Sequence, residues 1–322
     1  MQRKSDLSGC GDEARPRPAI SAIKANRPTV GLLDFFRLPF RQMHFKVRHL
    51  TEYRYSAPVG FAPHTLRLTP RSDKISHLKH ELLVDPEPVS LQVLTDAYGN
   101  PVTHVAFEEM SDCLAIESRF ELQTAPAPSL DGIDLLSLPW PDGASEQGAE
   151  GMTPYLSAEP EDETVQAFAR ELAAECNNAA LGFLQHLNTT LYTRTDRKIR
   201  DEGAAQTAAH TLAIGRGACR DLAVLFIAAC RSLNVPARFV SGYQAYAETA
   251  DGRRYLHAWP EAHLPGVGWI GFDPTHGVMV SDGHVAICAA PEQADTMPVS
   301  GGFYGQGITS TLHFEVEIET SQ

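Results

Sequence analysis

The sequence has few of the features that mark disulfide-rich, secreted or membrane-spanning chains. Its six cysteines form no CxxC pair, so neither a zinc ribbon nor a disulfide framework is indicated. The longest strictly apolar run, Leu222 to Cys230, has nine residues, whereas a helix needs roughly 20 to cross a bilayer. No apolar run near the start is uninterrupted enough to form a secretory signal. We therefore expect a cytoplasmic protein in which most thiols are free.

Positive charge is also scarce. Lys and Arg number 27 against 40 Asp and Glu, and the resulting net charge of −13 argues against nucleic-acid and anionic-membrane partners. Residues 1–42 reverse this balance, with eight basic and four acidic residues, and leave a net charge of −17 on residues 43–322. Because residues 1–42 also lack extended helical or strand periodicity, we predict that they form a mobile leader outside the fold.

The sequence lacks the common signatures of phosphate and metal sites. Residues 215–217 (Gly-Arg-Gly) have neither the glycine spacing nor the following Lys-Ser/Thr of a phosphate loop. Neither an HExxH motif nor an EF-hand loop is present. The sequence therefore predicts no cofactor and no metal ion.

A length of 322 residues, at about 100 to 200 residues per domain, favours two domains. Short alternating or β-branched segments separated by turns follow from residue 43 and predict an N-terminal antiparallel β-sandwich over residues 43–123. Residues 124–160 lose this periodicity and are rich in Pro, Gly, Ser and acidic residues, which is typical of a linker. The predicted strands are 44–56, 65–70, 75–85, 89–95, 102–108 and 114–123.

The second half of the chain mixes helical and strand patterns, so the fold class is predicted as α+β. Residues 161–191 have one apolar helical face, and residues 207–213 form a second, short helical pattern. The apolar run that begins after Cys219 predicts a helix buried on nearly every side. Strands are predicted at 237–247, 253–264, 268–273 and 311–318. We assign residues 161–290 to a core in which this helix packs on an antiparallel sheet, and residues 291–322 to a C-terminal tail and strand.

One cysteine stands where a thiolate would be stabilised. Cys219 follows a Gly-rich loop and opens the buried helix, where unpaired N–H groups and the helix dipole favour an anion. His257 and Asp273 lie on two strands joined by a turn at residues 265–267. Because strand side chains alternate, a reversal at this turn makes His257 and Asp273 opposite or diagonal neighbours on one face. The carboxylate could then orient the imidazole as a base for Cys219.

These motifs resemble the transglutaminase-like superfamily, whose core is papain-like, in the bacterial branch that carries an N-terminal β domain. Residues 217–222 (Gly-Ala-Cys-Arg-Asp-Leu) resemble the nucleophile motif, and residues 234–243 the strand after it. Residues 257–261 (His-Ala-Trp-Pro-Glu) and 268–275 resemble the histidine and aspartate motifs, in the family's order. Residues 53–59 and 63–70 resemble the β domain. The resemblance covers residues 43 to about 315 and implies that the C-terminal tail packs back on the core.

The resemblance implies that Cys219 attacks an amide carbonyl, His257 transfers protons, Asp273 positions His257, and a thioester acyl-enzyme forms. The backbone N–H of Cys219 is a candidate oxyanion donor. We expect a cysteine-dependent amide hydrolase, either a peptidase or an amidase, because water needs no dedicated acceptor site. Protein-glutamine transamidation is the alternative within enzymes, and a peptide-binding module on an inactive core is the alternative outside them. The expected partner is a protein or peptide that carries an amide acyl donor.

Overall fold

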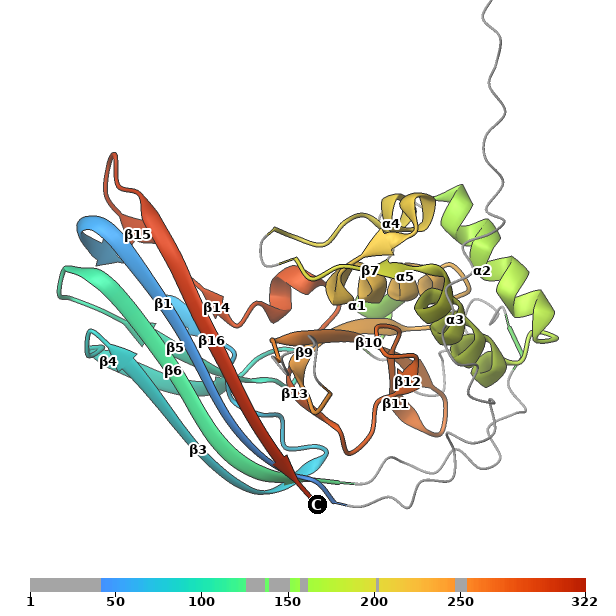
Figure 1. Cartoon of the computed structure of the whole chain (residues 1–322), viewed down its shortest axis with the longest axis horizontal. Coiled ribbons are helices and arrows are strands. Elements are labelled where there is room, and N and C mark those ends of the chain that lie inside the picture. The colour runs from blue at the N-terminus through green and yellow to red at the C-terminus, as the bar shows by residue number, and fades with distance from the viewer. Residues whose placement is uncertain (1–41, 126–136, 139–150, 157–161, 201–202, 247–253) are drawn as a thin grey trace, which may run out of the picture.

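The computed structural model describes residues 42–125, 137–138, 151–156, 162–200, 203–246 and 254–322. The predicted leader, except residue 42, and most of the predicted linker lie outside the described residues. Long curved strands form one side of the molecule, and helices with a shorter sheet form the other (Figure 1). The five cysteines in the described part of the chain are free thiols. None of the helices there is long and apolar enough to span a membrane.

The N-terminal half is a β-sandwich, as predicted. One sheet has the order β15-β1-β6-β3 with β16 also paired to β1, and the other has the order β14-β2-β5-β4. Alternate side chains of β1 and β6 point into an apolar core, which includes Phe45, Val47, Ile116 and Phe120. The six strands from the predicted region are β1 (His44–Phe61), β2 (His64–Leu66), β3 (Ile75–Asp85), β4 (Ser90–Thr95), β5 (Pro101–Ala106) and β6 (Ser111–Thr124).

The end of the chain completes this sandwich, which corrects the expectation that the tail packs on the core. β16 (Ser310–Ser321) runs antiparallel to β1 from Tyr55↔Ser310 to His44↔Ser321. The short strands β14 (Val299–Ser300) and β15 (Phe303–Tyr304) pair with β2 and β1. The long strand β1 has unpaired backbone groups on the side away from β6, and β16 satisfies them.

The second half is a helical layer on an antiparallel sheet of order β12-β11-β10-β9-β13. Helix α5 (Cys219–Arg231) packs on β9 and β10 and buries most of its residues, as its apolar pattern predicts. The sheet consists of β9 (Ala237–Gln244), β10 (His257–Leu264), β11 (Gly268–Asp273), β12 (Val278–Met279) and β13 (His284–Ala290). The other elements are α1 (Thr153–Leu156), α2 (Glu163–Glu175), α3 (Ala180–Arg194), β7 (Asp196–Arg197), α4 (Ala208–Ile214), β8 (Arg216–Gly217) and the 3-10 helix η2 (Gln293–Thr296).

One sequence prediction for this half is wrong, and one strand was not predicted. The single helix expected over residues 161–191 is two helices, because Asn177 and Asn178 adopt left-handed backbone angles (φ 52° and 57°) that end α2. Asn accepts this conformation more readily than most residues, so an apolar periodicity that continues across it does not guarantee one helix. The strand β13 (His284–Ala290) lies between the predicted strands 268–273 and 311–318 and was not among those predicted.

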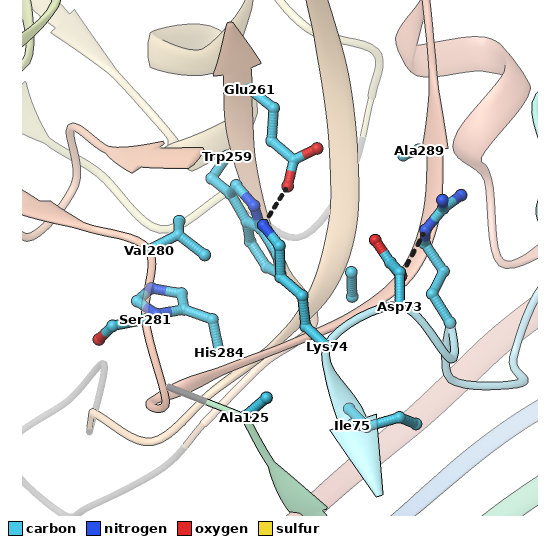
Figure 2. Close-up of a pocket in the computed structure, with 12 residues that line it drawn as sticks. Asp73, Lys74, Ile75, Ala125, Trp259, Glu261, Val280, Ser281, His284 and Ala289 are labelled. Atoms are coloured by element: carbon cyan, nitrogen blue, oxygen red, sulfur yellow. Dashed lines mark hydrogen bonds and ion pairs between the residues drawn. The ribbon is translucent and has the colours of Figure 1, made fainter. Parts of the chain in front are cut away.

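The two halves share buried surface along β9 and β13. Tyr243, Val285 and Ile287 belong to the same apolar cluster as the core of the N-terminal sandwich. Asn100, buried in the β4–β5 turn, donates to the Ala289 carbonyl (2.9 Å) and accepts from the Ala289 N–H (2.8 Å). A cavity of about 30 Å³, large enough to hold water, lies between the halves. Figure 2 shows residues that line it, including Lys74, Glu261 and His284. The N-terminal domain therefore holds β13 in place.

Candidate active site

Cys219 is the first residue of α5, at the point where the chain leaves β8. Its side chain is partly exposed, and its interaction with His257 helps to raise the pKa of that imidazole. The N–H groups in the first turn of a helix have no acceptor within the helix, so this position favours a negative charge on the sulfur or on an oxygen bound beside it.

His257 and Asp273 meet across the β10–β11 hairpin. The register pairs Leu264 with Gly268 and Glu261 with Gly271, so His257 and Asp273 fall on diagonal positions. His257 Nε2 lies 3.0 Å from Asp273 Oδ2, and both side chains are no more than 1% exposed. The structure thus brings together the three residues that the sequence singled out, one from the helix N-terminus and two from neighbouring strands.

The His257–Asp273 pair is held in its charged form. Burial disfavours the imidazolium, but the negative charge of Asp273, the hydrogen bond to Asp273 and the interaction with Cys219 outweigh burial and raise the pKa of His257 well above its usual value. Burial likewise disfavours the carboxylate, yet the charge and hydrogen bond of His257, with bonds from His276 and His284, hold the pKa of Asp273 well below its usual range. An imidazolium beside Cys219 is therefore available at neutral pH to stabilise a thiolate.

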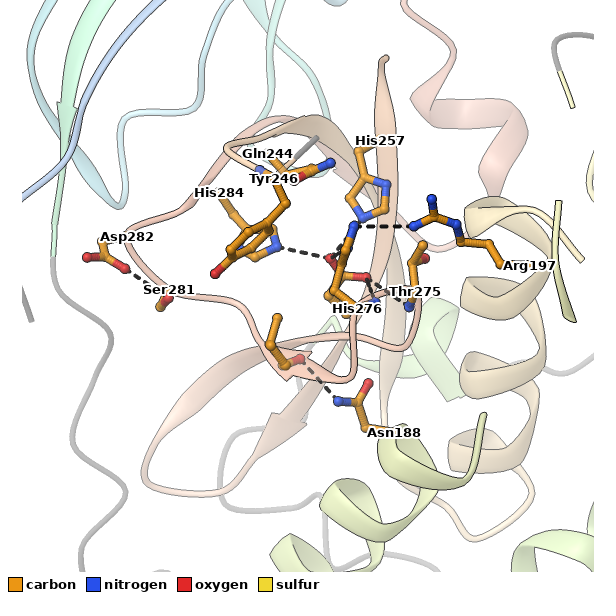
Figure 3. A network of polar contacts seen from close by, with 12 residues as sticks. Asn188, Arg197, Gln244, Tyr246, His257, Thr275, His276, Ser281, Asp282 and His284 are labelled. Atoms are coloured by element: carbon orange, nitrogen blue, oxygen red, sulfur yellow. Dashed lines mark hydrogen bonds and ion pairs between the residues drawn. The ribbon is translucent and has the colours of Figure 1, made fainter. Parts of the chain in front are cut away.

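Two further histidines contact the same carboxylate, and the sequence analysis assigned them no role. His276 Nδ1 lies 2.7 Å and His284 Nε2 lies 3.2 Å from Asp273 Oδ2. Figure 3 shows both rings with Tyr246 beside them, and the Tyr246 ring centroid lies 5.4 Å from that of His276 and 6.0 Å from that of His284. His284 is on β13, which was not predicted, whereas His276 lies only three residues after Asp273 and could have been noticed.

A second carboxylate, on Asp221, fixes the turn that presents Cys219. Asp221 is fully buried and accepts hydrogen bonds from the Ala218 N–H (2.7 Å), the Gln206 N–H (2.8 Å) and the Arg200 guanidinium (2.6 Å). This is half of a capping box, because the N-cap residue is Ala and returns no side-chain bond. Because residue 218 is Ala and not Ser or Thr, the capping box was not recognised from the sequence. Gly217 completes the turn, because a Cβ there would lie 2.9 Å from Asp221 Cβ.

We expect Asp221→Asn to lower the free energy of unfolding by about 1–3 kcal/mol. The amide group turns one acceptor into a donor, so it cannot accept from all three of its present partners. Urea denaturation measures the loss. Asp282→Asn is the control, because this partly exposed carboxylate accepts a hydrogen bond from the hydroxyl of its sequence neighbour Ser281 (3.0 Å). Equal stability of Asp221→Asn and the wild type would show that the turn does not depend on this carboxylate.

One group in the described part of the chain has the composition of a metal site. The ligand atoms of His257, Asp273 and His276 lie within 4.8 Å of one another, and two imidazoles with a carboxylate suit zinc. In the structure, His257 Nε2 and His276 Nδ1 are each hydrogen-bonded to the Asp273 carboxylate. The arrangement therefore serves as a hydrogen-bond network, and a metal ion would have to displace those bonds.

Comparison with known proteins agrees with this architecture. Residues 45–123 match the family model of the bacterial transglutaminase-like N-terminal region, and residues 166–274 match that of the transglutaminase-like superfamily. Uncharacterized proteins of Mycobacterium tuberculosis and Mycobacterium leprae are each 26% identical to the chain. The first alignment covers 87% of this chain and 94% of the relative, and the second covers 85% and 97%.

A solved structure shares the fold. It is a protein of Cytophaga hutchinsonii, described provisionally as a cysteine protease, with a TM-score of 0.65 and 21% identity over 88% of this chain and 92% of that one. Its likeness confirms an α+β fold with a papain-like core. The chain accordingly belongs to the transglutaminase-like superfamily and carries the bacterial N-terminal region of that family.

Proposed function

We propose that the protein is a cysteine-dependent amide hydrolase, a peptidase or amidase, in which Cys219, His257 and Asp273 form the catalytic triad. The observation that carries this proposal is the buried His257–Asp273 pair beside a partly exposed thiol at a helix N-terminus. A binding module on an inactive core would not need a buried, charged pair directed at a thiol. Superfamily membership supports an enzyme of this general class.

In the proposed mechanism each residue has one step. Asp273 occupies His257 Nε2, which leaves Nδ1 to exchange a proton with the Cys219 sulfur. The thiolate adds to the amide carbonyl, and the Cys219 N–H stabilises the resulting oxyanion. The His257 imidazolium then protonates the leaving amine, the C–N bond breaks, and a thioester remains on Cys219. Water, deprotonated by His257, attacks this thioester, releases the acid and restores the thiol.

We favour water over an amine as the acceptor because hydrolysis needs no second binding site. A library of peptides that contain glutamine and other amides, incubated with and without an excess of a primary amine, separates the two reactions. We expect cleaved or deamidated peptides under both conditions. Amine-linked products that dominate whenever amine is present would instead establish transamidation and would leave the triad intact. Binding of peptides without any turnover would favour the inactive-core alternative.

We propose that the substrate is a protein or peptide and that the protein acts in the cytoplasm. The acidic surface is consistent with partners other than nucleic acid and anionic membranes. Fractionation of cells that express the full chain would test the location, because activity in the periplasmic fraction would contradict it.

A further inference from the structure

Asp273 has more hydrogen-bond donors around it than a triad requires. Three imidazole nitrogens lie around its Oδ2: those of His257 (3.0 Å), His276 (2.7 Å) and His284 (3.2 Å). Its Oδ1 accepts from the backbone N–H groups of Thr275 (2.9 Å) and His276 (3.3 Å). The mechanism above uses only His257, so two imidazoles at a buried carboxylate are left without a role.

Each of the two extra rings donates a hydrogen bond to Asp273. A carboxylate can only accept, so the ring nitrogen that faces it must carry hydrogen. Arg197 Nη1 lies 3.4 Å from His276 Nε2 and is a donor, so Nε2 of His276 accepts and Nδ1 holds the proton. Burial lowers the pKa of His284 despite the opposing effect of Asp273, which makes His284 a neutral donor at pH 7. His284 therefore adds no full positive charge beside His257.

The two rings reach Asp273 from independent parts of the fold. His276 belongs to the turn that directly follows β11, whereas His284 opens β13 at the opposite edge of the sheet. The backbone of β13 is joined to the N-terminal domain through Asn100 and Ala289. His284 thereby links the position of the catalytic carboxylate to that of the N-terminal domain.

The groups around His284 leave the carboxylate as its principal polar contact. The Trp259 ring lies 5.3 Å and the Tyr246 ring 6.0 Å from the His284 ring, centroid to centroid. The charged and titratable groups that face it are Asp273, His257, His276 and Tyr246. Both Asp273 and His284 have side chains that are 0% exposed, so their hydrogen bond is shielded from water and constrains both groups.

We propose that His276 and His284 are positioning residues that fix the Asp273 carboxylate from two sides and share its negative charge, so that His257 keeps the orientation needed for proton exchange with Cys219. The inference rests on the proposed function for its consequence in catalysis. It does not rest on the identity of the acceptor, because both hydrolysis and transamidation pass through the same imidazole.

Paired substitutions separate hydrogen bonding from packing. The side-chain amide nitrogen of Gln replaces Nε2 of a histidine, and that of Asn replaces Nδ1, so His284→Gln and His276→Asn retain the donor. His284→Leu and His276→Leu remove it while filling similar space. We expect each Leu variant to lower kcat about tenfold, with KM nearly unchanged because the proposed role of both residues is exerted through Asp273, and each amide variant to recover most of the loss.

The pH dependence gives a readout that a purely structural role would not produce. With one donor fewer, more of the carboxylate's negative charge is available to His257, so the Leu variants should raise the pKa of His257 and move the alkaline limb of kcat/KM to higher pH. ¹⁵N NMR of the imidazoles, assigned with His257→Gln, measures that titration without any turnover. His313→Leu, a substitution of an exposed histidine on β16, is the control and should leave the titration unchanged.

The outcomes distinguish this inference from the proposed function. Absence of turnover in the wild type would refute the proposed function, and the NMR titration would still decide the roles of His276 and His284. Unchanged His257 titration in both Leu variants would overturn the inference. Amide variants as impaired as the Leu variants would also overturn it, because the loss of kcat would then come from altered packing and not from a lost hydrogen bond.

Discussion

Cys219→Ala is expected to reduce amide turnover by at least about 10⁴-fold, because removal of a triad nucleophile eliminates the covalent route entirely. The sulfur is the only atom removed, and the side chain is partly exposed, so the fold and substrate binding should change little. Turnover of the best peptide from the amide library measures the loss of activity. Calorimetry with the same peptide measures whether binding is retained.

Two other cysteines provide the control for this substitution. Cys113 on β6 and Cys176 after α2 are also partly exposed, but burial raises the pKa of both thiols. Their Ala variants should retain full turnover. Activity that survives in Cys219→Ala would remove the whole mechanism, whereas loss of peptide binding together with turnover would show that the side chain serves mainly in recognition.

The largest loss of stability is expected from Glu261→Gln, which should lower the free energy of unfolding by about 3–5 kcal/mol. Arg238 donates two hydrogen bonds to Glu261 Oε2, at 2.8 and 2.6 Å, and both side chains are at most 7% exposed. The neutral amide would leave the Arg238 guanidinium buried without a matching charge. Urea denaturation at pH 7 measures the effect.

Two comparisons test whether the loss comes from the unpaired charge. Replacing both partners, as Arg238→Met with Glu261→Leu, should recover at least about half of the loss, because no isolated charge remains. Glu319→Gln, which breaks the exposed pair with Lys46, should cost less than about 1 kcal/mol. A Glu261→Gln variant as stable as the wild type would show that the buried pair contributes nothing net.

Acid should remove the same contribution in the wild type. Burial alone would raise the pKa of Glu261, but Arg238 and Lys74 reverse this effect and lower it. A depressed folded-state value means that the stabilisation is fully present above the unfolded-state pKa of about 4.5 and is lost as pH falls through the lower folded value. The stability of Glu261→Gln should therefore decline less steeply below pH 4.5.

Local patterns were sufficient to predict most strands and the three candidate site residues. Alternation of apolar side chains located the strands of the sandwich, and the position of Cys219 before an apolar run predicted its place at a helix N-terminus. The short turn between β10 and β11 fixed which strand faces meet, so His257 and Asp273 could be paired from spacing alone. These inferences succeeded because each depends on residues close together in sequence.

Features that depend on distant parts of the chain were missed. The pairing of β16 with β1 joins residues more than 250 positions apart, and no local pattern specifies a strand's partner. His284 contacts Asp273 from β13, a strand that pairs with β9 at the far edge of the sheet. Asp221 was quoted in the nucleophile motif but was assigned no role, since Ala218 lacks the hydroxyl that usually marks a helix cap.

Limited alkylation by iodoacetamide at pH 6.5, with the modified sites identified by mass spectrometry, tests the central claim most directly. Cys219 should be labelled before any other cysteine, because its partly exposed sulfur lies at a helix N-terminus beside His257, and such surroundings make a thiol reactive. His257→Ala should slow that labelling and leave the other sites unchanged. Labelling of Cys10 or Cys176 first, with Cys219 unmodified, would contradict the assignment of Cys219 as the nucleophile.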